Sequence, residues 1–294
     1  MTIRIDAYVL LKRPWKPDFD AIASEFEWRY PQLGKARVRR GKGGDGQGTI
    51  TVDGAAVEIS HVGAPYPAEQ MHPPIRTLGH DVEEVARLTM GQSAYVVVTA
   101  SCEAAGMEWC RAYAALVTLV ADVVAARTDA LAVMWPDSWA CLSPAAFEEA
   151  AGAVLRGQVP VNLWVAFAQS NPPALGGAEM TGIVTLGLRN FMGLELELAP
   201  MPSLAGEAIG CMREAVGRLT SGTWMPEDHG TLRLDCYPAP LAVRLCPEGF
   251  LRRGVPAAVL IAPEAAVDPQ TLARKGSRPQ GEGAGLIGRL FRRV

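Results

Sequence analysis

Alternating polar and apolar residues open the chain. Residues 2–11 read TIRIDAYVLL, and this period of two predicts a β-strand. The next segment, Asp18–Arg29, carries apolar residues at helical spacing and predicts a short amphipathic helix. Two further strands are predicted at Thr49–Val52 and Ala56–His61, and the Asp-Gly pair between them is typical of a hairpin turn. The first 62 residues therefore predict a β-α-β-β unit.

A longer body follows the proline-rich residues 63–80. Its strands and helices alternate without a strict β-α-β order, which predicts an α+β fold with mixed β-sheets and helices packed on them. We therefore expect three parts: an N-terminal unit over 1–62, a main domain over 63–268 and a flexible basic tail over 269–294. The expected helices are at 81–88, 103–127, 204–219 and one that opens at Ser143-Pro144; the expected strands are at 94–99, 131–135, 159–167, 232–236, 241–245, 258–262 and two within 179–198.

Charge is distributed unevenly along the chain. The net charge is −3, but residues 1–43 carry ten lysines and arginines against five acids, and 274–294 carry six against one. The middle segment, 44–273, holds twelve arginines, no lysine and twenty-five acids. Such an acidic body should repel nucleic acid and would suit a basic protein partner. A solvated acidic surface that only keeps the protein soluble is the alternative.

Membrane and secretion signals are weak. The most apolar run, Ala114–Ala126, is interrupted by Asp122 and is shorter than the roughly 20 residues that a membrane span needs. The first residues lack the apolar core of a signal peptide, and the six cysteines form no C-x-x-C pair. We therefore expect a cytoplasmic protein without a transmembrane segment.

The C-terminal tail ends in GLIGRLFRRV, a short amphipathic basic sequence. It suits contact with a partner or a membrane surface. Ten residues are few for a stable helix, so a disordered, solubilising tail is the competing interpretation.

Recognised catalytic and cofactor motifs are absent from the sequence. Gly41-x-Gly43-x-x-Gly46 matches the dinucleotide fingerprint by spacing, but it leads into a predicted strand where the fingerprint requires a helix. The four histidines have no metal-site spacing, and neither a nucleophile elbow nor a phosphate-binding P-loop is present. We expect no cofactor and no metal.

The most suggestive polar residues are Glu195 and Glu197. On a strand, residues two apart share one face, so the two carboxylates should lie side by side. Neighbouring carboxylates raise the pKa of one of them, which is how acid–base pairs are made. Asp228 and His229, in a predicted turn, would complete a binding site if the fold brought them near. A solvent-facing strand would show the same pattern.

Several stretches resemble the bacterial family called domain of unknown function 4261. They include the loop GAPYPAEQ, the strand VVVTA with the alanine-rich helix after it, LAVMWPDSWACLSPAAFEEAA, VNLWVAF and TLGLRNFMGLELEL. The similarity covers about Ala56 to Pro263. It implies a fold and a bacterial setting and brings no established activity. The later turn departs from the family's Gly-Asp-Thr and reads Glu-Asp-His-Gly-Thr over 227–231.

Two functional hypotheses follow. The first is a non-catalytic bacterial binding protein, such as an immunity protein or an adaptor for a secreted toxin or a secretion system. The acidic body and the missing catalytic motifs favour it. The second is an enzyme or small-ligand-binding protein of unrecognised class that uses the paired carboxylates.

Overall fold

The fold is described from a computed structural model, which covers residues 2–41, 46–71, 77–78, 81–103, 107–170, 180–202 and 205–265. The chain forms two compact units. Unit 1 comprises Met1–Pro74 and Gly79–Val165, and unit 2 comprises Ile75–Leu78 and Ala166–Val294. Each unit is built on a seven-stranded sheet with helices, so the predicted α+β class is confirmed.

The sheet of unit 1 is antiparallel throughout, in the order β2-β3-β4-β6-β1-β7-β8. The first strand of the chain lies near its centre and pairs with β6 along all ten residues. The predicted hairpin joins β3 and β4, and both turn residues, Asp53 and Gly54, have positive φ. The strands are β1 Thr2–Leu11, β2 Ala36–Arg40, β3 Gln47–Val52, β4 Ala55–Val62, β6 Ala94–Glu103, β7 Ala130–Trp135 and β8 Ala140–Leu142.

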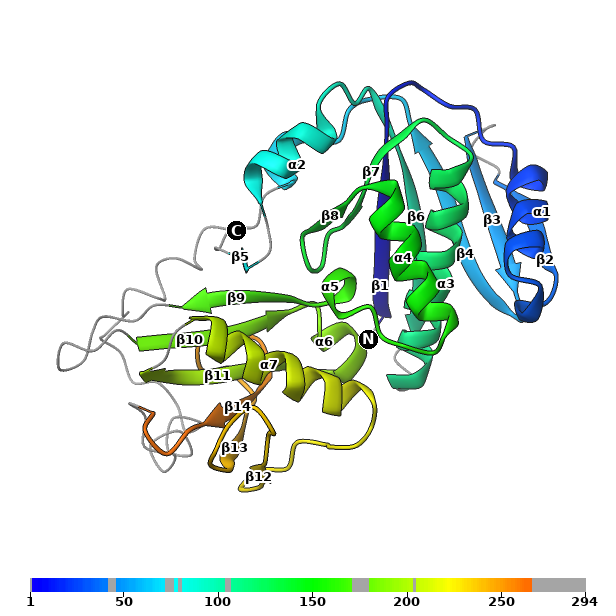
Figure 1. Ribbon diagram of the computed structural model, residues 1–294. Coiled ribbons are helices and arrows are strands. Elements are labelled where there is room, and N and C mark those ends of the chain that lie inside the picture. The colour runs from blue at the N-terminus through cyan, green and yellow to red at the C-terminus, as the bar shows by residue number, and fades with distance from the viewer. Residues whose placement is uncertain are drawn as a thin grey trace. The chain divides into compact units, whose positions relative to one another are not determined.

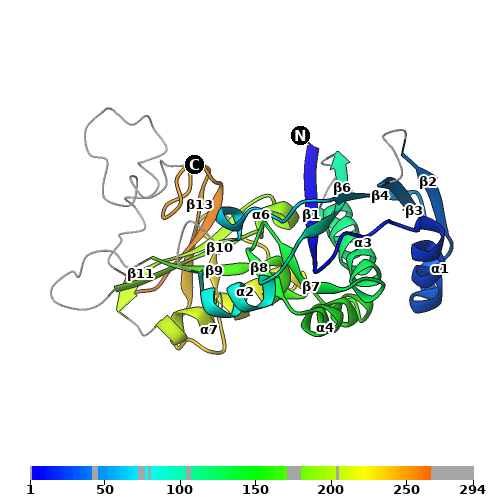
Figure 2. The same ribbon diagram turned by 90° about the horizontal axis from the view of Figure 1, so that it is seen from above.

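Three helices cover one face of this sheet: α1 (Phe19–Arg29), α3 (Met107–Ala126) and α4 (Pro144–Leu155) (Figure 1, Figure 2). Two of them begin at side-chain caps, and one of these, Ser143, lies at the predicted helix start. The Asp18 carboxylate accepts a hydrogen bond from the Ala21 amide, and the Ser143 hydroxyl accepts one from Ala146. On the face of β1 against which α3 packs, Ile5, Ala7 and Val9 are at most 1% exposed. A short 3-10 helix, η1 (Pro31–Leu33), connects α1 to β2.

The other face of the same sheet is covered only in part. Helix α2 (Val82–Thr89) and the 3-10 helix η2 (Ala68–Gln70) lie next to a second, smaller core. Farther toward β2, in-register residues of five strands form a polar row across this face. The small core contains Leu10, Tyr66, Met71, Val85, Ala132 and Met134. The polar row contains Arg39, Thr49, Glu58, Thr99 and Asp6.

Unit 2 has a mixed sheet in the order β12-β13-β14-β11-β10-β9-β5, in which β11 and β14 are parallel. Its central strands are buried along nearly their whole length. Helix α7 (Ala205–Thr220) lies across β10 and β11 (Figure 1), and α6 (Arg189–Met192) connects these two strands. The strands are β5 Thr77–Leu78, β9 Ala166–Ser170, β10 Met180–Leu186, β11 Glu195–Pro202, β12 Thr231–Leu232, β13 Leu241–Cys246 and β14 Ala257–Ile261.

Two predicted strands were wrong over much of their length. Of residues 232–236, only Leu232 lies in a strand, β12. Residues 159–167 form the short helix α5 (Val161–Trp164) followed by the start of β9. The Trp164 amide donates to the carbonyl of Pro160 at 3.0 Å, and its indole donates to Thr118 at 3.0 Å. A short apolar run does not distinguish a buried strand from a buried helical turn, and the contact with α3 favours the turn.

The division of the chain also differs from the expected boundary at residue 62. Strand β4 ends at Val62 and pairs with β6, so the strands of the first 62 residues share one sheet with β6, β7 and β8. The segment Ala36–Arg40, for which no element was predicted, is an additional strand at the edge of that sheet. The predicted tail over 269–294 lies outside the described residues.

Candidate functional site

The two glutamates predicted to share a strand face both lie on β11, and both are buried. Glu195 is 1% exposed and Glu197 is 0% exposed. The strand is not solvent-facing, because every residue of β11 except the last is buried. A buried carboxylate needs hydrogen-bond donors to offset its loss of water, so the donors show what each side chain does.

Glu195 organises the turn between β10 and α6. Its Oε2 accepts a hydrogen bond from the Thr185 hydroxyl at 2.7 Å and from the Leu188 amide at 3.1 Å, and its Oε1 accepts one from the Gly187 amide at 3.0 Å. Gly187 has a φ of 94°, a conformation that favours glycine. The carboxylate thus satisfies two backbone donors of a tight turn that would otherwise be buried without partners.

Glu197 does the same for the loop between β13 and β14. Its Oε2 accepts from the amides of Phe250 and Leu251 at 2.9 and 2.7 Å, and its Oε1 accepts from Arg252 at 2.9 Å. Three successive amides that converge on one anion form a nest. Here the anion belongs to the protein itself.

Burial changes the protonation of these groups. It raises the pKa of Glu195 to about 7, although the Thr185 hydrogen bond and the charge of Arg252 act in the opposite direction. It also raises the pKa of Glu197, against the pull of three backbone donors. Burial lowers the pKa of the Arg252 guanidinium, an effect that the two nearby carboxylates oppose. These two carboxylates and one guanidinium therefore influence one another's protonation.

The arrangement favours a structural role for both glutamates. All four carboxylate oxygens already accept hydrogen bonds, and the oxygens lie beneath the surface. A substrate would have to displace a turn or a loop to reach them. The spacing predicted the shared face, but it did not predict burial in the centre of a sheet.

Asp228 and His229 do not join the glutamates. Their side chains are 47% and 65% exposed. Asp228 accepts hydrogen bonds from the amides of His229 and Leu245, both at 3.1 Å, and so anchors the turn to β13. Within the described residues, neither side chain makes a hydrogen bond or ion pair with Glu195 or Glu197.

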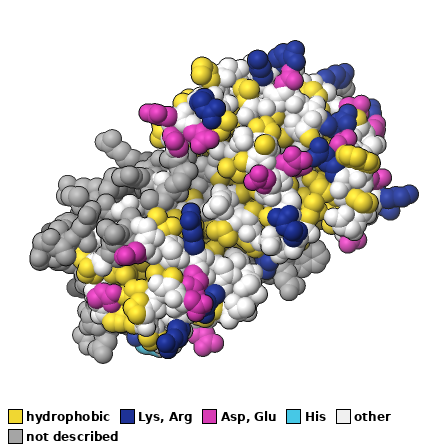
Figure 3. Space-filling view, viewed as in Figure 1, with side chains coloured by type: hydrophobic (Ala, Val, Ile, Leu, Met, Phe, Trp, Pro, Cys, Tyr) yellow, Lys and Arg dark blue, Asp and Glu magenta, His cyan; other side chains and the backbone are white. Residues whose placement is uncertain are grey.

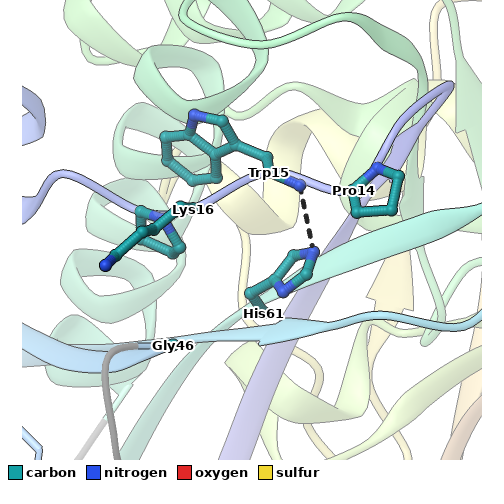
Figure 4. Close-up of a pocket in the computed structure, with 6 residues that line it drawn as sticks. Pro14, Trp15, Lys16, Gly46 and His61 are labelled. Carbon is teal, nitrogen blue, oxygen red and sulfur yellow. Dashed lines mark hydrogen bonds between the residues drawn. The ribbon is translucent and has the colours of Figure 1, made fainter.

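A shallow depression of about 400 Å³ lies in unit 1, between the loop after β1 and the end of β4 (Figure 4). His61 faces Trp15, whose backbone amide donates to the His61 Nε2 at 3.3 Å. Burial lowers the pKa of His61, which favours the neutral ring that this hydrogen bond requires. Its lining is Pro14, Trp15, Lys16, Pro17, Gly46 and His61. It is wide open to solvent, and its only imidazole nitrogen able to act as a base is already engaged.

The third candidate is a surface that we call the α1–β2 edge, made of Trp28 on α1 and the strand Ala36–Arg40. Strand β2 is the last strand of its sheet. The Gly41 amide bonds to the Gln47 carbonyl, so the antiparallel alternation directs the backbone groups of Val38 and Arg40 away from β3. Among the described residues no strand pairs with these groups.

The side chains of the α1–β2 edge differ in their partners. Arg40 lies on the α1 side and pairs with Asp20 at 2.7 Å. Arg37 and Arg39 point to the opposite face, are exposed, and make no ion pair with any residue that the structure describes. Trp28 is 76% exposed on the outer side of α1. In the space-filling view, dark-blue Lys and Arg side chains project at the right-hand margin, where Figure 1 places α1 and β2 (Figure 3).

The sequence carries a signal for the strand of this surface. The segment Arg37-Val38-Arg39 alternates charged and apolar residues, which is a strand pattern. The helical spacing of Phe19, Ile22 and Phe26 also leaves Trp28 on the outer face of α1.

Comparison with known proteins adds no assignment. No protein-family model, no curated protein and no solved structure matches this chain. The resemblance to domain of unknown function 4261 therefore stays a prediction. Across the described ranges, no helix is long and apolar enough to span a bilayer, and no three His, Cys, Asp or Glu side chains are grouped as metal ligands would be.

Proposed function

We propose that this chain is a non-catalytic protein-binding protein and that the α1–β2 edge is its binding surface. The observation that carries the proposal is a strand edge with outward backbone groups and two arginines, Arg37 and Arg39, that form no ion pair with the described residues. The neighbouring helix α1 adds an exposed Trp28 on its outer side. An immunity protein, or an adaptor for a secreted toxin or a secretion system, would be one form of this function.

Physical chemistry favours a binding role for each of these features. Unpaired backbone groups on a sheet edge are a template for another chain. Tryptophan and arginine are the residues most enriched among those that dominate binding energy at interfaces. A large aromatic side chain that is three-quarters exposed gains hydrophobic free energy when a partner covers it.

The alternative, an enzyme or small-ligand protein built on the paired carboxylates, has weaker support. A pKa of about 7 for Glu195 would suit a general acid or base. However, the carboxylate oxygens of both glutamates already accept hydrogen bonds from backbone amides or a hydroxyl group, and neither residue is exposed. We therefore favour binding over catalysis.

The expected charge of the partner depends on whether long-range or local electrostatic interactions dominate its docking. The acidic middle segment favours a basic partner over long distances. At physiological salt, charges more than about 8 Å apart are largely screened. The local arginines therefore have more influence on what docks at β2 than the net charge does.

The test is affinity capture with the full-length chain from a lysate of its native host, followed by identification of any stoichiometric partner. Trp28→Ser should weaken the affinity for the captured partner about thirtyfold or more, since a buried tryptophan typically contributes about 2 kcal/mol or more at an interface. Met90→Ser is the matched control, because Met90 is 73% exposed in the same unit but away from α1. A partner held equally by both variants, or no partner at all, would contradict the proposal.

A further inference from the structure

We infer that the α1–β2 edge binds an acidic, extended protein segment, which adds to the sheet as a strand beside β2. This inference rests on the proposed function and names the class of partner. Its basis is a strand edge that no described strand covers, together with two arginines on one face of that edge that form no ion pair with the described residues.

The backbone of β2 supplies the register for such an addition. Val38 and Arg40 direct their amide and carbonyl groups away from β3. The Ala36 amide points the same way but already donates to Glu27 Oε1 at 2.8 Å. A docking strand would therefore pair mainly with Val38 and Arg40, and η1 and α1 bound the edge at its beginning.

On the face of β2 opposite α1, the side chains favour a partner segment with acidic residues. Arg37 and Arg39 are alternate residues of one strand, so they stand about 6.6 Å apart, the repeat of same-face side chains on any added strand. Their in-register neighbours on β3 are Thr51 and Thr49, which carry no charge. The nearest carboxylate along the polar row, Glu58, lies one strand farther away. Two carboxylates at alternate positions of the partner would meet the two guanidinium groups in the geometry of charge-assisted pairs.

The opposite side of the same edge disfavours acid. There, Asp20 and Glu27 project from α1 over β2, and Arg40 is already paired with Asp20. A carboxylate directed to this side would face two carboxylates and a guanidinium that is already engaged. The expected partner is therefore acidic at every second residue and uncharged at the residues between.

Charged residues on edge strands also have a purely protective use, because they deter unwanted strand pairing. The two explanations differ in what they predict. Protection requires only that strands be repelled or left unbound. Recognition requires that an acidic strand bind and that its affinity depend on both its charges and its backbone amides.

The probe is a labelled nonapeptide in which Glu alternates with Thr, titrated against the full chain by fluorescence anisotropy. We expect saturable binding that weakens as salt is raised. Replacing Glu by Gln in the peptide, or methylating alternate backbone nitrogens, should weaken binding about tenfold or more. On binding, the amides of Val38 and Arg40 should exchange their hydrogens more slowly.

The matched protein variants are Arg37→Glu/Arg39→Glu and the control Arg87→Glu/Arg253→Glu, which reverses two exposed arginines elsewhere. The first should lose the Glu peptide and gain binding of a Lys-Thr peptide, and the control should behave like the natural chain. If the Glu peptide fails to bind, or binds both variants equally, the inference is overturned. If the capture of a partner still depends on Trp28, the proposed function stands although the acidic-strand inference fails. If neither the peptide nor a Trp28-dependent partner binds, both proposals fail.

Discussion

Two pairs of like charges, each two residues apart on a strand, have opposite surroundings in this protein. Glu195 and Glu197 lie on a central strand of unit 2, buried, and each accepts three hydrogen bonds. Arg37 and Arg39 lie on an edge strand of unit 1, exposed and without an ion pair among the described residues. The sequence spacing is the same. The position of the strand in its sheet decides whether the charges hold the fold together or remain available to a partner.

The energetic consequences differ in the same way. A buried carboxylate is costly unless donors offset its desolvation, and removing it leaves those donors unpaired. An exposed guanidinium keeps its water, so its removal changes little in the folded state. Variants of the two pairs should therefore separate effects on stability from effects on binding.

The largest expected effect is that of Glu197→Ala. It would leave the amides of Phe250, Leu251 and Arg252 without an acceptor, and we expect the free energy of unfolding of unit 2 to fall by about 3–5 kcal/mol. Urea denaturation would measure the loss, and hydrogen exchange over residues 247–256 would locate it in the loop.

Glu58→Ala is the control for this variant, since Glu58 also lies on a strand but is exposed. Its effect should stay within about 0.5 kcal/mol. Equal effects of the two substitutions would show that the nest around Glu197 contributes nothing particular to the fold.

The next effect is a dependence of stability on pH. The pKa of Glu195 is about 7 in the folded protein against an ordinary 4.5. The folded state therefore binds a proton that the unfolded state releases between these values. The stabilisation of the folded state by this proton is fully present below pH 4.5 and is lost as the pH rises through 7. The free energy of unfolding should fall by roughly 3 kcal/mol over this range.

Glu195→Gln should flatten this part of the pH profile, because the amide stays uncharged as the protonated acid does. Thr185→Val should move the decline to higher pH, because it removes a hydrogen bond that holds the pKa down. Parallel profiles for the natural chain and Glu195→Gln, measured as free energy of unfolding from pH 4 to 8, would contradict the assignment.

A smaller effect distinguishes two glycines in the loop that Glu197 holds. Gly249 and Gly254 both have positive φ, at 66° and 79°. A Cβ on Gly249 would lie 2.1 Å from the carbonyl oxygen of Arg252, whereas one on Gly254 would meet nothing within 4 Å. Alanine at position 254 should cost about 1 kcal/mol from backbone strain, and alanine at 249 should cost about 2 kcal/mol more.

Thermal denaturation of the two glycine variants side by side would measure this difference. The comparison isolates the close approach of the loop backbone, because the backbone strain is common to both positions. Similar losses would mean that the loop is free to move away from Glu197.

Much of the fold could be predicted from the sequence, because its local signals agree with its tertiary contacts. The alternation in residues 2–11, the helix start at Ser143-Pro144 and the Asp-Gly turn all produced the expected elements. The helix over 161–164 could not be predicted, because its support comes from Thr118, far away in the sequence.

The candidate site was harder to predict for a related reason. Alternation correctly placed Glu195 and Glu197 on one face, but burial depends on what covers that face, and the loop that donates to Glu197 follows it by more than fifty residues. The strand β2 was missed because its arginines outweighed its single valine in the hydrophobic pattern. A period of two in charge carries the same structural information as a period of two in hydrophobicity.

The smallest expected change in stability is the one that most sharpens the comparison. Arg37→Glu/Arg39→Glu should alter the free energy of unfolding by no more than about 0.5 kcal/mol, because both side chains are exposed and lack ion pairs with the described residues. The same variant should lose the acidic peptide. Urea denaturation and peptide titration on one preparation would measure both quantities. A stability loss comparable to that of Glu197→Ala would mean that the arginines support the sheet, and their value for recognition could then not be separated from the fold.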